Sequence, residues 1–229
     1  MNRVVCIVGM HRSGTSSLAG SLEEAGLHLG EVITSAPHNF KGNRENRRIM
    51  DLQEAVLVHS GGSWDRPPER ATWSDEHRAS RDAIIHSYEH TPVWGFKDPR
   101  TLLLLDFWRE ALSTLTFVGT FRHPLLVAES LSRRNGGSTE QWLDLWAAYT
   151  ERQLALHDSG PFPIVRFDAG EDVYRRSLAV MMETLGLRAP ARLGFFDPVL
   201  KHHVEPEPRA LPERIQRLYD RLCRIAISP

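Results

Sequence analysis

The chain has 229 residues, of which 41% are hydrophobic and 25% are charged, and this is enough for a sizeable buried core in one compact domain. Its 28 Lys and Arg residues stand against 29 Asp and Glu residues, so the formal net charge is -1. This balance excludes an overall field that attracts nucleic acid or a membrane surface. Any anion site must therefore be local.

Two features bear on the compartment. The chain contains only Cys6 and Cys223, which argues against a disulfide framework and favours a reducing environment. The N-terminus enters an apolar stretch of about six residues, which is shorter than a signal-peptide core or the roughly 20 residues of a membrane span. We therefore expect a single cytoplasmic domain over residues 1–229.

Four short runs rich in β-branched and aromatic residues are predicted as strands. They cover residues 3–8, 93–97, 115–121 and 162–167. After the first run comes Gly9, and then Leu18, Leu22 and Ala25 recur at helical spacing. The other runs are separated by segments long enough for helical crossovers. This alternation predicts a three-layer α/β/α fold with a central parallel sheet of four to five strands.

The second half of the chain carries further helix and loop signals. Ser138 with Gln141 fits a capping box at the start of a long helix. Pro212 suits the first turn of the last helix. Two segments, 61–73 and 201–212, are rich in Pro, Gly and charge, and we predict them to be surface loops that can cover the active site.

The segment from Gly9 to Leu18 reads GMHRSGTSSL and lies where a strand passes into a helix, a geometry that binds phosphate. Gly9 and Gly14 keep the spacing of a nucleotide-binding P-loop, but the lysine expected at position 15 is absent and Arg12 supplies the cation. The alternative is a glycine-rich turn without a ligand. The phosphate site is favoured by four hydroxyl-bearing residues around the basic one, namely Ser13, Thr15, Ser16 and Ser17.

The segment from Arg12 to Ser16 resembles the 5′-phosphosulfate loop of the sulfotransferases that use 3′-phosphoadenosine 5′-phosphosulfate (PAPS). A second signature of that family is an arginine that ends a later strand, with a serine eight positions on, and the pair holds the 3′-phosphate. Arg122 and Ser130, in FRHPLLVAESL, match this spacing and placement. Arg122 offers a bidentate fork to a phosphate, and Ser130 adds a hydroxyl about two turns into the following helix.

A third segment, IVRFDAGEDVYRRSLAVMMETLGL, is similar to the family's strand that ends in Tyr-Glu-Asp. Phe167 takes the tyrosine position, where the resemblance implies stacking on adenine, and the alternative is an aromatic packed into the core. The Gly-x-x-Gly-x-x-Lys pattern of the family's cytosolic branch is missing near the C-terminus, which favours the bacterial and carbohydrate- or peptide-modifying branches. The implied donor-binding residues are Arg12, Ser13, Gly14, Thr15, Ser16, Ser17, Arg122, Ser130 and Phe167.

The resemblance implies a reaction that moves a sulfuryl group from PAPS to a hydroxyl or amine, leaves 3′-phosphoadenosine 5′-phosphate (PAP), and needs no metal. It requires a base and a cation at the leaving oxygen. The histidine of the family's Lys-x-His pattern is absent from GFKDPR, and the segment 39–57 resembles the part of bacterial members that carries a catalytic glutamate. Glu45 is the candidate base, with Arg12 preferred for the leaving oxygen and Lys97 as second choice and acceptor contact.

Helical spacing supports an inward Glu45. If Asn43 caps the following helix, Glu45 shares a stripe with Ile49, Leu52 and Val56. The competing explanation is an acid in the first helical turn that complements the helix dipole. Reserve bases are His11 and His38, although a loop histidine is more often a bystander.

Other charged groups are weaker candidates. His202 and His203 beside Lys201 lack further ligands at metal-binding spacing, so we reject a metal site there. A basic cluster can face an anionic acceptor or be a solvated helix face, and it consists of Lys41, Arg44, Arg47 and Arg48.

Two other functions remain open. A P-loop phosphotransferase would need Mg²⁺ ligands, for which Asp98 is the only tempting residue, and the missing loop lysine weighs against it. A non-catalytic module that binds the bisphosphate product would show nucleotide binding without transfer. The acceptor, whether a small molecule, a carbohydrate or a peptide, and the oligomeric state cannot be predicted from the sequence.

Overall fold

The first strand shows how the sequence forms the sheet. In β1 (Arg3–Val8), Val4, Cys6 and Val8 belong to one buried cluster, while Val5 and Ile7 belong to another. Successive side chains of a strand point to opposite faces, so a strand buried on both faces lies inside a sheet with helices on either side. The computed structural model describes residues 2–36, 41–191, 193–196 and 210–228.

The sheet has four parallel strands in the order β2-β1-β3-β4. The other three strands are β2 (Val93–Lys97), β3 (Leu115–Phe121) and β4 (Ile164–Arg166). Because the chain runs from β1 to neighbours on both sides, β1 lies at the point where the strand order reverses, and ligands of such sheets bind outside the strand ends at that point. The predicted fold class is confirmed. The fourth strand is shorter than predicted, since Pro161 and Pro163 lack the N–H groups that a ladder needs.

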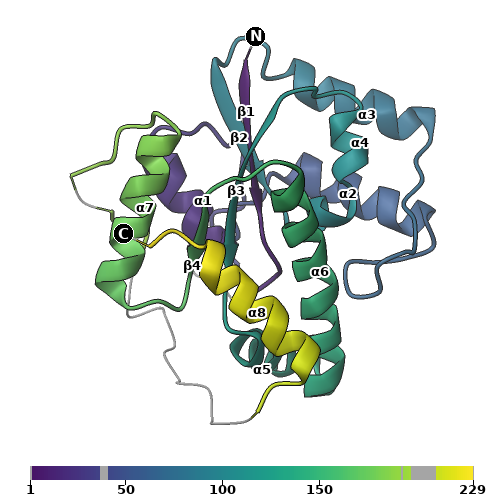
Figure 1. The fold of residues 1–229 in the computed structure, drawn as a ribbon. Coiled ribbons are helices and arrows are strands. Elements are labelled where there is room, and N and C mark those ends of the chain that lie inside the picture. The colour runs from purple at the N-terminus through teal and green to yellow at the C-terminus, as the bar shows by residue number, and fades with distance from the viewer. Residues whose placement is uncertain (1, 37–40, 192, 197–209, 229) are drawn as a thin grey trace.

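Helices cover both faces of the sheet (Figure 1). On one face, α1 (Thr15–Glu24) and α7 (Glu171–Thr184) contribute to the cluster around Val5 and Ile7. The opposite face is covered by α2 (Arg47–His59), α3 (Asp75–His86), α4 (Leu105–Arg109), α5 (Pro124–Asn135), α6 (Thr139–Ser159) and α8 (Glu213–Ile225). A short 3₁₀ helix, η1 (Pro99–Leu103), follows β2. None of the described helices combines the length and apolarity needed to cross a membrane.

The helix starts agree with the sequence in one case and differ in two. Ser138 caps α6, and its side chain accepts from the Gln141 N–H at 3.2 Å. Pro212 is the residue before α8 rather than part of its first turn. The cap of α2 is Asn46, which accepts from the N–H groups of the next turn, so the prediction of Asn43 was wrong.

The reason for the later start of α2 is an extended segment in front of it. Ile33 donates its N–H to the Glu45 carbonyl at 3.0 Å, and Arg44 donates to the Ile33 carbonyl at 3.1 Å. Asn46 forms a bridge with Val32. These pairings hold Glu45 in an extended backbone and not in a helix.

The first predicted loop, 61–73, lies between α2 and α3. Both of its ends are tied down. Ser60 Oγ accepts from the Thr72 N–H at 2.9 Å, and Tyr149 of α6 donates its hydroxyl to the Trp64 carbonyl at 2.8 Å. Residues 201–209 of the second predicted loop lie outside the described residues, as do His38, Lys201, His202 and His203.

Candidate functional site

The loop after β1 is held against the end of β3. Gly9 has φ 152° and Gly14 has φ 86°, values at which a side chain is strained. A Cβ on Gly9 would overlap the Thr120 carbonyl, and Thr120 Oγ1 donates to the Ser13 carbonyl at 3.0 Å. Since α1 begins at Thr15, the N–H groups of its first turn have no acceptor within the helix and face this loop. The predicted strand, loop and helix arrangement is present, and it can bind an anion.

Arg12 joins the two phosphate signatures. Its φ of 64° lies in the left-handed region, which is uncommon for a residue with a side chain. From this conformation Arg12 Nε donates to Ser130 Oγ at 2.8 Å, across 118 positions of sequence. Ser130 lies in α5 and is buried. The structure therefore brings the loop and the serine of the second signature into one site.

Arg122 follows β3 directly and lies beside Phe167, with the guanidinium carbon 5.8 Å from the ring centroid. The Arg122 Nε is buried and has no hydrogen-bond partner among the described residues. Neither Arg12 nor Arg122 forms an ion pair with a carboxylate of the described residues. Burial of an unpaired cation is costly, and an anionic ligand would offset that cost.

Several guanidinium groups lie close enough to Arg12, at the phosphate-loop end of the site, for their charges to act on it. Burial, together with the charges of three neighbours, lowers the pKa of Arg12 to about 10. Those neighbours are Arg134, Arg122 and Arg133. Burial also lowers the pKa of Arg122. The repulsion between Arg12 and Arg122 is relieved when a multiply charged anion binds between these two side chains.

Phe167 has the contacts of a core residue. A Cβ on Gly14 would overlap its ring, and the ring meets Tyr174 of α7 edge-on at 5.6 Å between centroids. Tyr174 also donates its hydroxyl to Ser17 Oγ at 3.2 Å, so the Ser17 hydroxyl in α1 already has a partner in α7. By contrast, Ser13 Oγ is buried and finds no hydrogen-bond partner in the described part of the chain. Phe167 therefore packs under the phosphate loop, and its stacking on adenine stays a prediction.

Glu45 and Lys97 form a buried ion pair. Lys97 Nζ lies 2.7 Å from Glu45 Oε1, and the two side chains are 2% and 9% exposed. Lys97 is the last residue of β2, next to β1 and the phosphate loop. The prediction of an inward Glu45 near Lys97 agrees with this geometry. The stripe argument and the helix-dipole alternative were both wrong, because Glu45 precedes the helix.

A second buried carboxylate lies beside this pair. Asp98 is 1% exposed and accepts from Arg100 Nη1 at 3.0 and 3.1 Å, while Arg100 Nε reaches Glu54 at 2.9 Å. Burial raises the pKa of Asp98 to about 6. Asp98 also caps η1 through the Arg100 N–H. Its oxygens are thus engaged by Arg100, and the described residues contain no group of three His, Cys, Asp or Glu side chains arranged for a metal.

His11 lies in an aromatic setting that the sequence did not predict. Its ring centroid is 4.5 Å from that of Trp64 and 5.9 Å from that of Tyr149. The Nε2 atom is buried with no hydrogen-bond partner within the described ranges, and burial lowers the pKa of the imidazole. Trp64 belongs to the 61–73 loop, so this loop does lie against the phosphate loop. The composition of residues 61–73 indicated a surface loop, but nothing in the sequence indicated that this loop would lie against the phosphate loop.

The predicted basic cluster does not form one anion-binding face. Lys41 Nζ donates to the carbonyls of Gly194 and Phe195 at 2.9 and 2.8 Å. Arg44 forms an ion pair with Glu23 at 3.2 Å. The remaining members, Arg47 and Arg48, are exposed at the start of α2.

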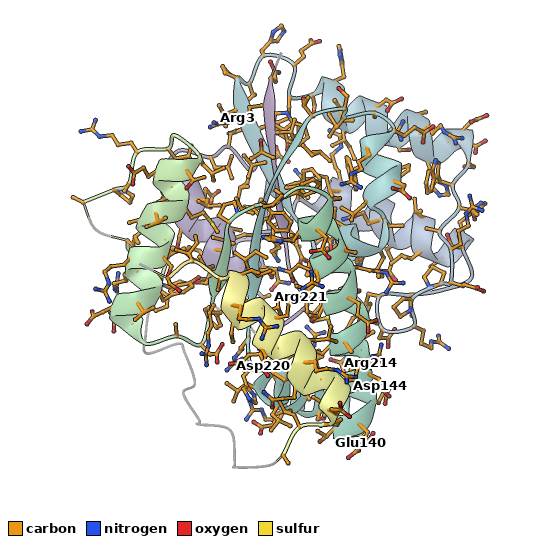
Figure 2. The ribbon with its side chains drawn as sticks, in the orientation of Figure 1. Arg3, Glu140, Asp144, Arg214, Asp220 and Arg221 are labelled. Atoms are coloured by element: carbon orange, nitrogen blue, oxygen red, sulfur yellow. The ribbon has the colours of Figure 1, made fainter. Side chains whose placement is uncertain are left out.

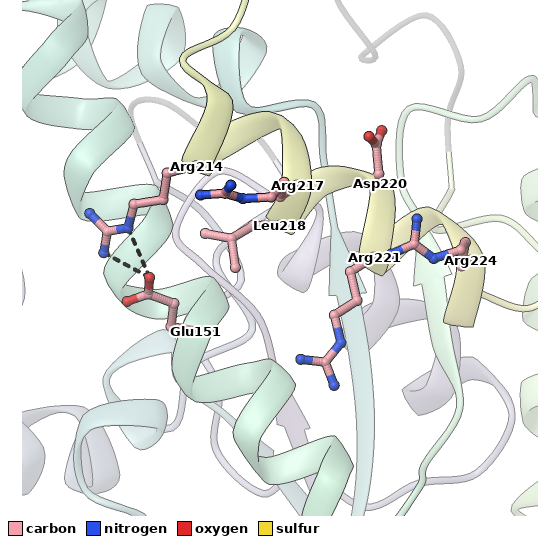
Figure 3. A pocket seen from close by; sticks show the side chains of 7 residues that line it. All are labelled: Glu151, Arg214, Arg217, Leu218, Asp220, Arg221 and Arg224. Atoms are coloured by element: carbon pink, nitrogen blue, oxygen red, sulfur yellow. Dashed lines mark hydrogen bonds and ion pairs between the residues drawn. The ribbon is translucent and has the colours of Figure 1, made fainter.

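A cavity of about 440 Å³ opens between α6 and α8 (Figure 3) and is lined by Glu151, Arg214, Arg217, Leu218, Asp220, Arg221 and Arg224. Figure 2 shows Arg214, Asp220 and Arg221 projecting from α8. Arg214 binds Glu151 at 2.8 Å, and Arg221 binds Asp158. Two of the four arginines that line the cavity thus have acidic partners on α6, and Arg217 pairs with Glu213 of α8, so we assign the cavity no role in the site.

Together, the parallel sheet and the cationic loop at its reversal point define an α/β protein with a candidate anion-binding site. No protein-family model matches the sequence, and a comparison with curated proteins finds no match. Among solved structures, the chain is similar to the sulfotransferase domain from the Synechococcus PCC 7002 olefin synthase, with a TM-score of 0.59, 18% identity, and coverage of 97% of this chain and 94% of that one. Sulfotransferase STF1 from Mycobacterium tuberculosis H37Rv also matches, with a TM-score of 0.46, 15% identity, and coverage of 97% and 76%. The chain has the fold of a sulfotransferase domain, as the resemblance predicted.

Proposed function

We propose that this protein is a sulfotransferase that takes its sulfuryl group from PAPS and releases PAP. The observation that carries the proposal is the hydrogen bond between Arg12 and Ser130 at 2.8 Å, which unites two signatures for phosphate groups at opposite ends of one nucleotide. Arg122 adds a buried, unpaired Nε to the same region. A donor with two phosphate-bearing positions fits this pattern better than a donor with a single phosphate chain.

The residues present fit such a donor. The first turn of α1 and the unpartnered Ser13 Oγ would hold the 5′-phosphosulfate. Arg122 and Ser130 would hold the 3′-phosphate. When bound, PAPS supplies an activated sulfuryl group on a phosphate leaving group.

Each catalytic side chain has a defined task in this proposal. Glu45 takes the proton of the acceptor hydroxyl or amine as that atom forms its bond to sulfur. Arg12 donates to the bridging oxygen, which leaves on the 5′-phosphate with the electron pair of the broken S–O bond. Lys97 orients the Glu45 carboxylate through their 2.7 Å contact. No metal takes part in these steps.

Thermal unfolding with and without nucleotides tests the proposal. PAP without Mg²⁺ should raise the midpoint of unfolding, and ATP with Mg²⁺ should not, because only the folded protein binds the bisphosphate. The opposite ranking would favour the phosphotransferase and overturn the proposal.

A transfer assay separates the enzyme from a non-catalytic binding module. Labelled donor incubated with a panel of hydroxyl and amine acceptors should yield labelled product in the presence of the protein. Tight PAP binding with no transfer to any acceptor, and no donor turnover, would support the binding module instead.

A further inference from the structure

Arg134 lies in the last turn of α5, half-buried beside the 61–73 loop. Its guanidinium carbon is 5.5 Å from the ring centroid of Trp64, and its Nε donates to Asn135 Oδ1 at 2.7 Å. Trp64 in turn lies 4.5 Å from His11, which precedes Arg12 in the phosphate loop. This chain of contacts links Arg134, through Trp64, to the phosphate loop.

Electrostatic effects agree with that location. The positive charge of Arg134 contributes to the lowered pKa values of His11 and Arg12. The pKa of Arg134 itself is lowered, first by burial, while the negative charge of Glu45 acts in the opposite direction. The charge of Arg134 therefore acts on both the phosphate loop and the candidate base.

The cations at this end of the site differ in their partners. Lys97 is paired with Glu45, and Arg100 is paired with Asp98 and Glu54. Arg134 forms no ion pair within the part of the chain that the structure describes. A half-buried guanidinium without a counter-charge is stabilised by an anion that reaches it.

We infer that Arg134 is the recognition site for a carboxylate on the acceptor. The indole of Trp64 lies against the guanidinium, and the planar fork of an arginine matches a carboxylate in two parallel hydrogen bonds. One unpaired cation balances one negative charge, which fits a carboxylate better than a doubly charged phosphate. This inference rests on the proposed function, because an acceptor exists only if the protein is a transferase.

Two phenols of matched shape test the inference. They are 4-hydroxyphenylacetate and its neutral analogue 4-hydroxyphenylacetamide, and their binding to the PAP-saturated protein is measured by calorimetry. The carboxylate should bind at least about tenfold more tightly, the ratio that one charged hydrogen bond supports. Arg134→Gln should remove the preference, while Arg134→Lys should retain part of it, since lysine keeps the charge without the fork.

Arg133→Gln is the matched control, because it removes the same charge from the exposed neighbouring position. It should leave the preference unchanged. Equal affinities of the two phenols, no binding of the carboxylate, or an equal loss in Arg133→Gln would each overturn the inference while PAP still binds. If PAP fails to stabilise the protein, the proposed function fails and the inference falls with it.

Discussion

The two ends of the candidate site differ in whether their charged side chains have ion-pair partners. At the phosphate-loop end, Arg12 and Arg122 have no carboxylate partner among the described residues, and Arg12 is held by a serine hydroxyl. At the other end, Lys97 is locked to Glu45 at 2.7 Å. Partly buried cations without a carboxylate partner favour an anionic ligand, whereas the carboxylate of a buried ion pair is held in one position. Under the proposed function, this difference divides the site into a donor-binding end and a chemical end.

The largest expected effect concerns the stability of the chemical end. Lys97→Met leaves the Glu45 carboxylate buried without a partner, which should lower the free energy of unfolding by about 3–5 kcal/mol. Urea denaturation measures this loss. The double variant Lys97→Met/Glu45→Leu should recover much of it, because an apolar pair of similar volume leaves no charge uncompensated. If the double variant is no more stable than the single one, the pair is not the source of the effect.

The next effect is on turnover. Glu45→Gln should lower turnover by about 10² or more while PAP affinity persists, as expected when a general base is lost. Glu54→Gln serves as a control. Glu54 also pairs with a cation, but that cation is Arg100 and not Lys97, and the Glu54 side chain is 42% exposed. Steady-state kinetics of both variants give the comparison. Full activity in Glu45→Gln would move the proton acceptor to another group, such as His11.

A smaller effect is expected at Gly14, where the phosphate loop packs against Phe167. Gly14→Ala places a Cβ against the Phe167 ring, in a left-handed backbone with φ 86°. Gly26→Ala introduces the same kind of strain at φ 97° with nothing within 4 Å, at a cost of about 1–2 kcal/mol. Gly14→Ala should cost roughly 1 kcal/mol more, the scale of local overpacking, and should also weaken PAP binding. Equal losses in urea denaturation would mean that the Phe167 contact is unimportant.

More of the donor end than of the acceptor end could be predicted from the sequence, for physical reasons. The spacing of Arg12, Arg122 and Ser130 is set by the strand ends and by the helices that follow them, and these are local features of the chain. Glu45 was predicted to point inward, but its orientation comes from an extended pairing with residues 32–33 and not from helical periodicity.

The acceptor end depends on contacts between distant parts of the chain. Trp64 reaches His11 because its loop is anchored by Tyr149, 85 positions away. Arg134 acquires its environment from that same loop. No periodicity in one sequence encodes the path of such a loop, so neither residue could be assigned to the site before the fold was known.

The central claim is that the donor end holds both phosphates of one nucleotide, and calorimetry with PAP and adenosine 5′-monophosphate tests it most directly. The wild-type protein should bind PAP at least about tenfold more tightly, since the 3′-phosphate adds a charged hydrogen bond of about 1.5 kcal/mol or more. Arg122→Ala should remove most of that difference, and Arg133→Ala should not. A ratio of affinities that Arg122→Ala leaves unchanged would contradict the account.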